Sequence, residues 1–370
     1  MSKLITKLFI YSRLTLVSIF LLVVPYYVES NEYLIEIPVG LIEPDIPLNN
    51  KLSKLKIELG KKIFFDKRLS SSSKFSCATC HDPTHGFAEK RSISINSKGE
   101  LLERNSPSVL NTGYQATLSW DGRFKSLEEQ ALNPFTKNGD MGIEIEDAIN
   151  KIDSFHDYDG LFETAFGKKV DTLGLAQSLA SFQRSLISAN SRFDDYLFNG
   201  NKKALTKSEL DGYEIFIGKG SCIACHDIFH PSVNSLGGGI ALFTDHRFHN
   251  LGVGYKNGKM TDTGRYWVTR KKEDWGAFKT PILRNVALTP PYMHDGSLES
   301  LFDVVEFYNK GGNPNPNIAP GIRPLLLNEI EINSLVSFLR ALTDENLINS
   351  SISEQHRLIS SINARNSLTE

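Results

Sequence analysis

Two short motifs contain every cysteine in the chain. They are Cys77-Ala-Thr-Cys80-His81 and Cys222-Ile-Ala-Cys225-His226. In each motif, two thiols three positions apart are followed at once by an imidazole, which is the attachment signature of c-type haem. The thiols bond to the porphyrin vinyl groups, and the histidine binds the iron on its proximal side. The motifs therefore predict two covalently attached haems.

Other chemistries of paired cysteines fit these motifs less well. A structural zinc site could use two C-x-x-C pairs, but it would not need a histidine directly after each pair. A thioredoxin-like redox pair is typical of a βαβ context, and a disulfide framework is typical of a much smaller secreted chain. Because the histidine occurs twice and no cysteine is left over, haem attachment is favoured over all three.

The length and the charge of the chain limit its class. Its 370 residues are enough for about two domains, each with a core of its own. The 41 basic side chains nearly balance the 43 acidic ones. The overall charge therefore indicates neither a nucleic-acid partner nor a strongly acidic one.

The N-terminus has the features of a secretory signal peptide. Basic residues precede the apolar run 14–24, and Val28-Glu-Ser30 supplies small residues for cleavage. The apolar run is short for a membrane span, although an uncleaved N-terminal anchor remains an alternative. Export agrees with c-type haem, which is attached outside the bacterial cytoplasm, so we expect the protein in the periplasm.

A helical pattern precedes each haem motif. One apolar periodicity runs from Lys54 to Phe65, and another follows the capping box formed by Thr206 and Glu209. The two segments share three residues in the same order: Gly60, Ile63 and Phe64 in the first, Gly212, Ile215 and Phe216 in the second. This repeat predicts a mainly α protein with two cytochrome c-like domains, each carrying one haem, and with the haems facing across the domain interface. The expected divisions are a signal peptide (1–30), an N-terminal haem domain (31–200), a C-terminal haem domain (201–345) and a polar tail (346–370).

Further helices are predicted elsewhere. Ser126 and Glu129 form another capping box, and the spacing of apolar residues predicts one long helix over 173–198. A closing helix is expected to start after Asn328 and to run through Leu342. Strand signals are weak throughout.

Five ordered stretches carry a family resemblance. They are Cys77-Ala-Thr-Cys-His-Asp-Pro, Arg104-Asn-Ser-Pro-Ser-Val-Leu-Asn, Trp120-Asp-Gly-Arg, Gly276-Ala-Phe-Lys-Thr-Pro-Ile-Leu-Arg-Asn-Val and Thr289-Pro-Pro-Tyr-Met-His-Asp-Gly. On these stretches the chain resembles the bacterial di-haem cytochrome c peroxidase superfamily, which includes the MauG proteins. The resemblance spans about residues 40 to 345. It implies that the N-terminal haem is the peroxide site and that the C-terminal haem stores and relays an electron.

The resemblance also implies roles for single residues. His81 and His226 become the proximal iron ligands, and Trp120 falls where the family places an indole between the two porphyrins. Asp140 falls where an acid, commonly glutamate, moves a proton on peroxide, and its shorter side chain is a departure from the family. Gln130 matches a glutamine of the peroxide pocket in MauG-like members. Without the resemblance, the acid would be read as a solvated loop residue and the glutamine as a solvated helix residue.

Two positions bear on the subfamily. Classical members carry a histidine that caps the peroxide-binding iron until the other haem is reduced, but here the position holds Ser97. The nearby His85 is too close to His81 to reach the opposite face, so we expect an open resting iron that needs no reductive activation. The sixth ligand of the second haem is expected to be Tyr308, as in MauG-like members. The alternatives left open are Met293, Met260 and His294.

A calcium ion between the domains is implied as well. Its ligands would be the Asn105 side chain and the backbone carbonyls of Thr289 and Pro291, with waters.

The favoured function is a peroxidase that reduces hydrogen peroxide with electrons from a small cytochrome or cupredoxin. The alternatives are a MauG-type enzyme that oxidises side chains of a partner protein and a non-enzymatic electron carrier. A homodimer is compatible with all three.

Overall fold

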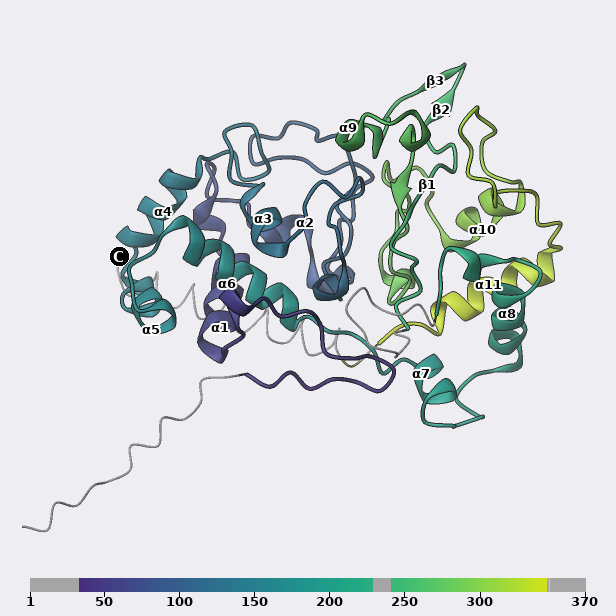
Figure 1. Ribbon diagram of the computed structural model, residues 1–370, viewed down its shortest axis with the longest axis horizontal. Coiled ribbons are helices and arrows are strands. Elements are labelled where there is room, and N and C mark those ends of the chain that lie inside the picture. Colours follow the sequence, from purple (N-terminus) through teal and green to yellow (C-terminus); the bar gives the residue numbers. More distant parts are fainter. Residues whose placement is uncertain (1–32, 229–240, 345, 347–370) are drawn as a thin grey trace, which may run out of the picture. The chain divides into compact units, whose positions relative to one another are not determined.

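The regular structure is mostly helical, joined by long loops (Figure 1). The computed structural model describes residues 33–228, 241–344 and 346. The α-helices of this part are α1 (Lys54–Phe65), α2 (Cys77–Cys80), α3 (Leu127–Leu132), α4 (Ile145–Ser154), α5 (Leu161–Phe166), α6 (Thr172–Ser185), α7 (Arg192–Leu197), α8 (Lys207–Ile217), α9 (Tyr266–Thr269), α10 (Leu301–Asn309) and α11 (Glu329–Arg340). Its strands are β1 (Phe248–His249), β2 (Tyr255–Lys256), β3 (Lys259–Met260) and β4 (Phe278–Lys279). They form two antiparallel pairs, β1 with β4 and β2 with β3.

The helix before the first motif packs closely on α6 (Figure 1). Ser53 caps α1 by accepting a hydrogen bond from the Lys56 N–H at 3.3 Å. A Cβ at Gly60 would collide with the backbone carbonyl of Ser178, so glycine is what lets the two backbones meet. One turn later, the rings of Phe64 and Phe182 meet edge to face with centroids 5.1 Å apart. Each such buried phenylalanine stabilises the fold by about 1.5–3 kcal/mol.

The helix before the second motif repeats this packing on α11. Thr206 and Glu209 form the predicted capping box of α8. A Cβ at Gly212 would collide with the Ser334 carbonyl, and the rings of Phe216 and Phe338 lie 5.2 Å apart. The repeated glycine and phenylalanine in the sequence thus mark two copies of one helix pair. This helix-rich fold agrees with the predicted mainly α class.

Two hydrophobic cores correspond to the two copies. The first collects side chains between Ile57 and Leu186, and the second collects side chains between Phe193 and Leu342. Both lie in the part of the chain from Glu32 onward, which packs as one unit. Phe193 of α7 belongs to the second core, although the sequence placed it before the expected boundary at residue 200. That boundary stays a prediction.

The predicted long helix over 173–198 is wrong, because the chain forms α6 and α7 with a loop between them. The Asn111 side chain donates to the Ser188 carbonyl at 2.9 Å and accepts from the Ser188 N–H at 2.8 Å. These bonds replace the helical bonds that Ser188 would otherwise make. Ser191 then caps α7 with a capping box. The closing helix α11 starts after Asn328 as predicted and ends at Arg340, two residues short of Leu342.

Within the residues that the structure describes, none of the helices is both long and apolar enough to cross a membrane. The predicted signal peptide and nearly all of the predicted polar tail lie outside those residues.

Candidate active site

The first haem motif forms a single helical turn. Ser76 and Thr79 make a capping box at the start of α2, and the His81 N–H closes the turn on the Cys77 carbonyl at 2.9 Å. The thiols of Cys77 and Cys80 and the imidazole therefore project from one short, rigid turn. The His81 Nδ1 lies 3.3 Å from the Phe87 carbonyl.

The second motif has the same construction on a short 3-10 turn, Cys222–Ala224. The His226 N–H donates to the Cys222 carbonyl at 2.8 Å, and its Nδ1 lies 2.9 Å from the Phe243 carbonyl. In both motifs a carbonyl engages Nδ1, which leaves Nε2 for iron. Burial lowers the pKa of His81 and of His226, so both imidazoles are kept in the neutral form that binds a metal.

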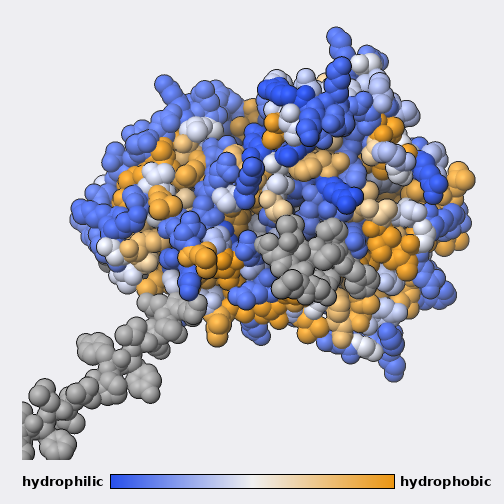
Figure 2. Space-filling model, viewed as in Figure 1, coloured by the Kyte–Doolittle hydropathy of each residue, from blue (hydrophilic) through white to orange (hydrophobic). Residues whose placement is uncertain are grey.

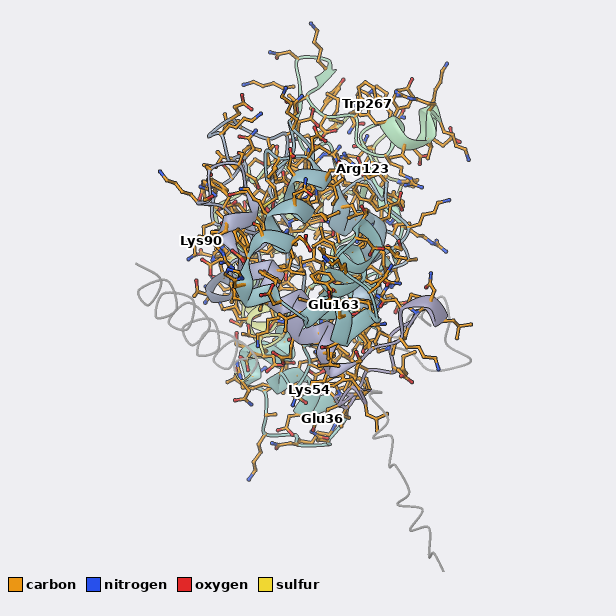
Figure 3. The ribbon with its side chains drawn as sticks, turned by 90° about the vertical axis from the view of Figure 1, so that its left-hand side faces the viewer. Glu36, Lys54, Lys90, Arg123, Glu163 and Trp267 are labelled. Atoms are coloured by element: carbon orange, nitrogen blue, oxygen red, sulfur yellow. The ribbon has the colours of Figure 1, made fainter. Side chains whose placement is uncertain are left out.

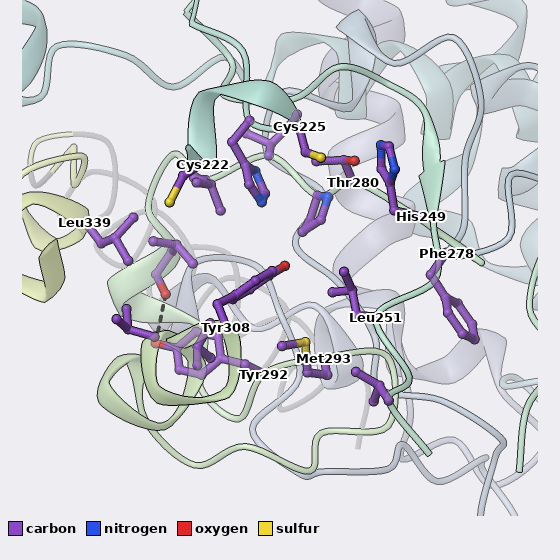
Figure 4. A pocket seen from close by; sticks show the side chains of 18 of the residues that line it. Cys222, Cys225, His249, Leu251, Phe278, Thr280, Tyr292, Met293, Tyr308 and Leu339 are labelled. Atoms are coloured by element: carbon purple, nitrogen blue, oxygen red, sulfur yellow. Dashed lines mark hydrogen bonds between the residues drawn. The ribbon is translucent and has the colours of Figure 1, made fainter. Parts of the chain in front are cut away.

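A cavity of about 420 Å³ lies beside the second motif. Cys222, Cys225 and His226 line one wall, and Tyr308 of α10 lines the opposite one. Figure 4 shows the hydroxyl end of Tyr308 directed into the cavity, toward the side on which Cys225 lies. The concave, mostly apolar space with two thiols and two candidate axial ligands fits a haem.

The charges around this cavity also fit a haem, whose two propionates are anions. The described residues that line it include the cations Lys279, Arg284 and Arg323 but no aspartate or glutamate. Arg284 is already paired, because its guanidinium binds both carboxylate oxygens of Asp194 at 2.7 Å. Lys279 is 8% exposed, and its Nζ donates to the Gln115 side chain at 2.5 Å. Burial lowers the pKa of Lys279 to about 8, and no carboxylate among the described residues offsets that cost.

We expect Lys279→Met to lower the reduction potential of the second haem. A buried positive charge near the porphyrin favours the reduced form, and its loss removes a Coulomb energy that corresponds to a shift on the order of tens of millivolts. Spectroelectrochemical titration of both haems measures this directly. The matched control is Lys202→Met, at an exposed lysine, and equal potentials in the two variants would contradict the assignment.

Tyr308 stands out among the candidates for the sixth ligand. Its hydroxyl makes no hydrogen bond to a described residue, and burial together with the Cys222 and Cys225 charges raises its pKa. Met293 and His294 also line the cavity, whereas Met260 does not and instead lies with its terminal methyl against Gly276. The His294 ring stacks on Phe278 with centroids 3.7 Å apart, and its buried Nε2 has no partner in the described part of the chain. The ligand role of Tyr308 stays a prediction.

Trp120 joins the two halves of the chain. It lines the cavity of the second motif, and its Nε1 donates to the Asn105 carbonyl at 2.8 Å. The Trp120 carbonyl accepts from the Lys279 N–H at 2.8 Å. Pro107 lines the same cavity, and its backbone lies within hydrogen-bonding reach of the His81 ring. The indole is therefore held in the segment that separates the two motifs.

Asp140 lies near the first motif. The thiols of Cys77 and Cys80 have raised pKa values, chiefly through burial, and the negative charge of Asp140 adds to both shifts. Burial also raises the pKa of Asp140 itself, and its carboxylate has no ion pair in the described structure. The carboxyl group is thus suited to hold and release a proton.

Ser97 binds the backbone of the segment that carries Asp140. The Ser97 N–H donates to the Asp140 carbonyl at 2.9 Å, and its hydroxyl donates to the Met141 carbonyl at 2.8 Å. Gln130 lies on α3, partly buried, and its amide makes no hydrogen bond to a described residue. The Met141 N–H donates to the Pro134 carbonyl at 3.0 Å, which folds the chain back between Gln130 and Asp140.

The His85 side chain is engaged in a hydrogen bond. Its Nε2 donates to the Pro290 carbonyl at 2.5 Å, which ties the loop after the first motif to a distant part of the chain. Ser97 and His85 are thus both engaged with backbone carbonyls, and the expected open iron position stays a prediction.

Comparison with known proteins gives these features a family. Residues 54–203 match the family described as di-haem cytochrome c peroxidase. The chain is 35% identical over 301 residues to the methylamine utilization protein MauG of Methylorubrum extorquens, covering 81% of each chain. The chain belongs to the di-haem cytochrome c peroxidase family. The predicted superfamily is thereby confirmed, and the protein is an oxidoreductase of the peroxidase type that uses haem.

Two further similarities support this membership. The chain is 35% identical over 291 residues to the cytochrome c551 peroxidase of Nitrosomonas europaea, which covers 78% of this chain and 80% of that one. Its fold matches the crystal structure of a MauG-like protein associated with microbial copper homeostasis with a TM-score of 0.75 and 31% identity. That match covers 85% of this chain and 97% of the other. The relatives therefore include proteins named MauG and proteins named cytochrome c peroxidase.

The predicted calcium ligands of this family member come together from distant segments. Asn105, Thr289 and Pro291 all line the same cavity. The Asn105 Nδ2 donates to the Arg91 carbonyl at 2.8 Å, which leaves its Oδ1 available. Neither the Thr289 nor the Pro291 carbonyl accepts a backbone hydrogen bond from a described residue. Three free neutral oxygens suit a hard cation such as calcium.

Sequence reasoning missed an ionic cluster beside Trp120. The Arg104 guanidinium binds Asp262 at 2.6 Å and Asp121 at 2.8 Å, joining segments 158 residues apart. Sequence reasoning also missed Lys279 as a haem-side cation. Arg104 and Lys279 both lie in stretches that carry the family resemblance. That resemblance was the one signal that could have singled them out.

Proposed function

We propose that this protein reduces hydrogen peroxide to water at the N-terminal haem, with electrons relayed through the C-terminal haem. Each peroxide takes up two protons and two electrons and yields two waters. The observation that carries the proposal is Asp140, a partly buried carboxyl group without an ion pair beside both cysteines of the first motif. An electron carrier would have no use for such a group at an iron site.

The side chains divide the work around this site. Haem, when bound, would supply the open iron position at which peroxide binds and its oxygen–oxygen bond breaks. Asp140 takes the proton from one peroxide oxygen and delivers it to the other. The Gln130 amide donates a hydrogen bond to the departing oxygen. His81 is oriented by its Nδ1 contact with the Phe87 carbonyl.

We expect the ferric protein as isolated to react with peroxide without prior reduction. Its spectrum should show a five-coordinate high-spin haem beside a six-coordinate low-spin haem, because Ser97 and His85 are both engaged elsewhere. Absorption and EPR spectra, followed by stopped-flow mixing with peroxide, measure this. If the isolated protein is wholly low-spin and reacts only after half-reduction, a side chain caps the first iron. The protein would then use the mechanism of the classical peroxidases, which requires reductive activation.

The same experiment tests the proton-transfer role. Asp140→Asn should slow the reaction with peroxide by about 10²–10⁴-fold, since an amide cannot carry the proton. The matched control is Asp147→Asn, an exposed carboxylate on α4 with the same chemical change. If Asp140→Asn reacts as fast as the control, another group moves the proton.

A MauG-type activity is the second candidate, in which oxidising equivalents from peroxide act on side chains of a partner protein. It is supported by Tyr308, whose free hydroxyl faces the second haem cavity, and by the similarity to a protein named MauG. As a phenolate ligand, Tyr308 would stabilise ferric iron and lower the potential of the second haem. The two candidates differ in whether the reaction consumes a reduced donor or modifies a protein.

The remaining assignments complete the proposal. Asn105, Thr289 and Pro291 would hold a calcium ion, and Trp120 would pass electrons between the two haems. The electron donor is a small cytochrome or cupredoxin. The predicted signal peptide places the protein in the periplasm, where c-type haem is attached.

A further inference from the structure

An exposed tryptophan lies on α9, a short helix next to the β2–β3 pair. The Trp267 side chain is 59% exposed and Val268 is 41% exposed. Arg270 covers part of the indole, with its guanidinium carbon 4.5 Å from the ring centroid. Large aromatic side chains in contact with arginine are typical of the centres of protein interfaces. We call the exposed face formed by α9, β2–β3 and residues 270–272 the α9 surface.

This surface is positively charged. Its exposed cations are Lys256, Lys259, Arg270, Lys271 and Lys272. Of the acids in the same segment, Asp262 is bound to Arg104 at 2.6 Å and Asp274 accepts a hydrogen bond from Thr269 at 2.6 Å. Glu273 is exposed beside the cations, so five exposed cations face one exposed carboxylate. Figure 2 shows mostly hydrophilic side chains gathered over this part of the molecule. The chain as a whole has a net charge of −2, so the overall balance conceals a local basic patch.

Local contacts join the β2–β3 hairpin to the segment that follows α9. The rings of Tyr255 and Trp275 meet edge to face with centroids 6.1 Å apart. The Thr261 N–H donates to the Gly254 carbonyl, and the Thr263 carbonyl accepts from both Tyr266 and Gly276. The exposed cations of the hairpin and of residues 270–272 are therefore carried by one segment of chain that is held together by these contacts.

The α9 surface is bonded directly to the segment that carries Trp120. Arg265, the residue that caps α9, donates from Nη1 to the carbonyls of Asp121 and Gly122, both at 2.8 Å. Its guanidinium also lies over the Phe248 ring at 4.3 Å. Figure 3 shows Trp267 and Arg123, which follows this turn, at the same end of the molecule. Only one residue, Tyr266, separates Arg265 from Trp267 in the chain.

We propose that the α9 surface docks an acidic electron-transfer protein and receives its electrons next to Trp120. Positive charge around an exposed aromatic centre is complementary to a partner whose redox centre is ringed by carboxylates. This inference rests on the proposed peroxidase function and adds the entry point for its electrons. Each docked partner is oxidised by one electron, so two reduced partners and two protons are consumed for every peroxide. The overall charge gave no indication of such a partner, whereas the local distribution does.

The test measures steady-state peroxide turnover with two donors. One is a reduced cupredoxin of net negative charge, and the other is ABTS, a small-molecule donor that needs no docking surface. Trp267→Ala and the pair Lys271→Glu with Lys272→Glu should each raise the KM for the cupredoxin at least tenfold. The charge-reversed pair should also lose the salt dependence of that KM. Turnover with ABTS should stay unchanged in both variants.

The matched control is Lys202→Glu with Lys203→Glu, another pair of adjacent exposed lysines. It should behave as the unmodified protein with both donors. An unchanged KM for the cupredoxin in the α9 variants, or an equal rise in the control, would overturn the docking site. Unmodified protein that uses ABTS and a basic cytochrome but not the acidic cupredoxin would overturn the partner chemistry. Failure of the unmodified protein with every donor would instead contradict the proposed peroxidase function.

Discussion

Cys77→Ser combined with Cys80→Ser should leave one covalent haem per chain and reduce peroxide turnover to background. The two thiols project from the single turn of α2, beside the Asp140 carboxyl group. Without them the first haem is not retained, and the proton-transfer residue has no substrate site to serve. Haem content by the pyridine haemochrome method and the mass of the mature chain measure the first effect, and a peroxide assay measures the second.

The companion variant Cys222→Ser with Cys225→Ser separates the two sites. It should also retain one haem, and that haem should still react with peroxide although turnover with a donor is lost. If this variant no longer reacts with peroxide while the Cys77→Ser, Cys80→Ser variant still does, the second haem is the peroxide site and the proposed roles are reversed. A protein that carries stoichiometric zinc, or one extractable haem, would overturn the architecture.

Tyr308→Phe should raise the reduction potential of the second haem or change its spin state. The phenol points into the second cavity without a hydrogen-bond partner among the described residues, and an anionic oxygen ligand stabilises ferric iron. Loss of the oxygen removes that stabilisation but leaves the pocket around Asp140 intact. The absorption spectrum and the potential of the second haem should therefore change, while the reaction of the first haem with peroxide persists.

Met293→Leu and Met260→Leu are the matched comparisons. Met293 lines the same cavity, whereas Met260 lies against Gly276 outside it, so neither change should remove the low-spin signal if tyrosine is the ligand. A methionine ligand predicts a weak sulfur-to-iron charge-transfer band that disappears in one of these variants. That result, with an unaltered second haem in Tyr308→Phe, would place the protein among the classical peroxidases.

The sequence by itself determined those features that depend on neighbours in the chain. Attachment of haem needs two thiols and an imidazole within five positions, so Cys77 to His81 and Cys222 to His226 could be identified without a fold. The capping boxes at Thr206 and Asn328 are equally local, and α8 and α11 begin where these residues predict. The repeated glycine and phenylalanine could also be recognised in the sequence. Both helix pairs need a glycine where the backbones meet and a phenylalanine one turn later, so the same residues recur at the same spacing.

The tertiary structure alone decided the features that depend on distant segments. The break between α6 and α7 is made by Asn111, which bonds to Ser188 across 77 residues, so apolar periodicity could not reveal it. Lys279 becomes a buried charge at the cavity because of the fold and not because of its sequence neighbours, and no carboxylate among the described residues offsets its burial. The anchoring of Arg265 on the Asp121 carbonyl spans 144 residues and brings the exposed indole of Trp267 to the segment of Trp120. Burial and long-range hydrogen bonds are properties of the folded chain, and no spacing within the sequence encodes them visibly.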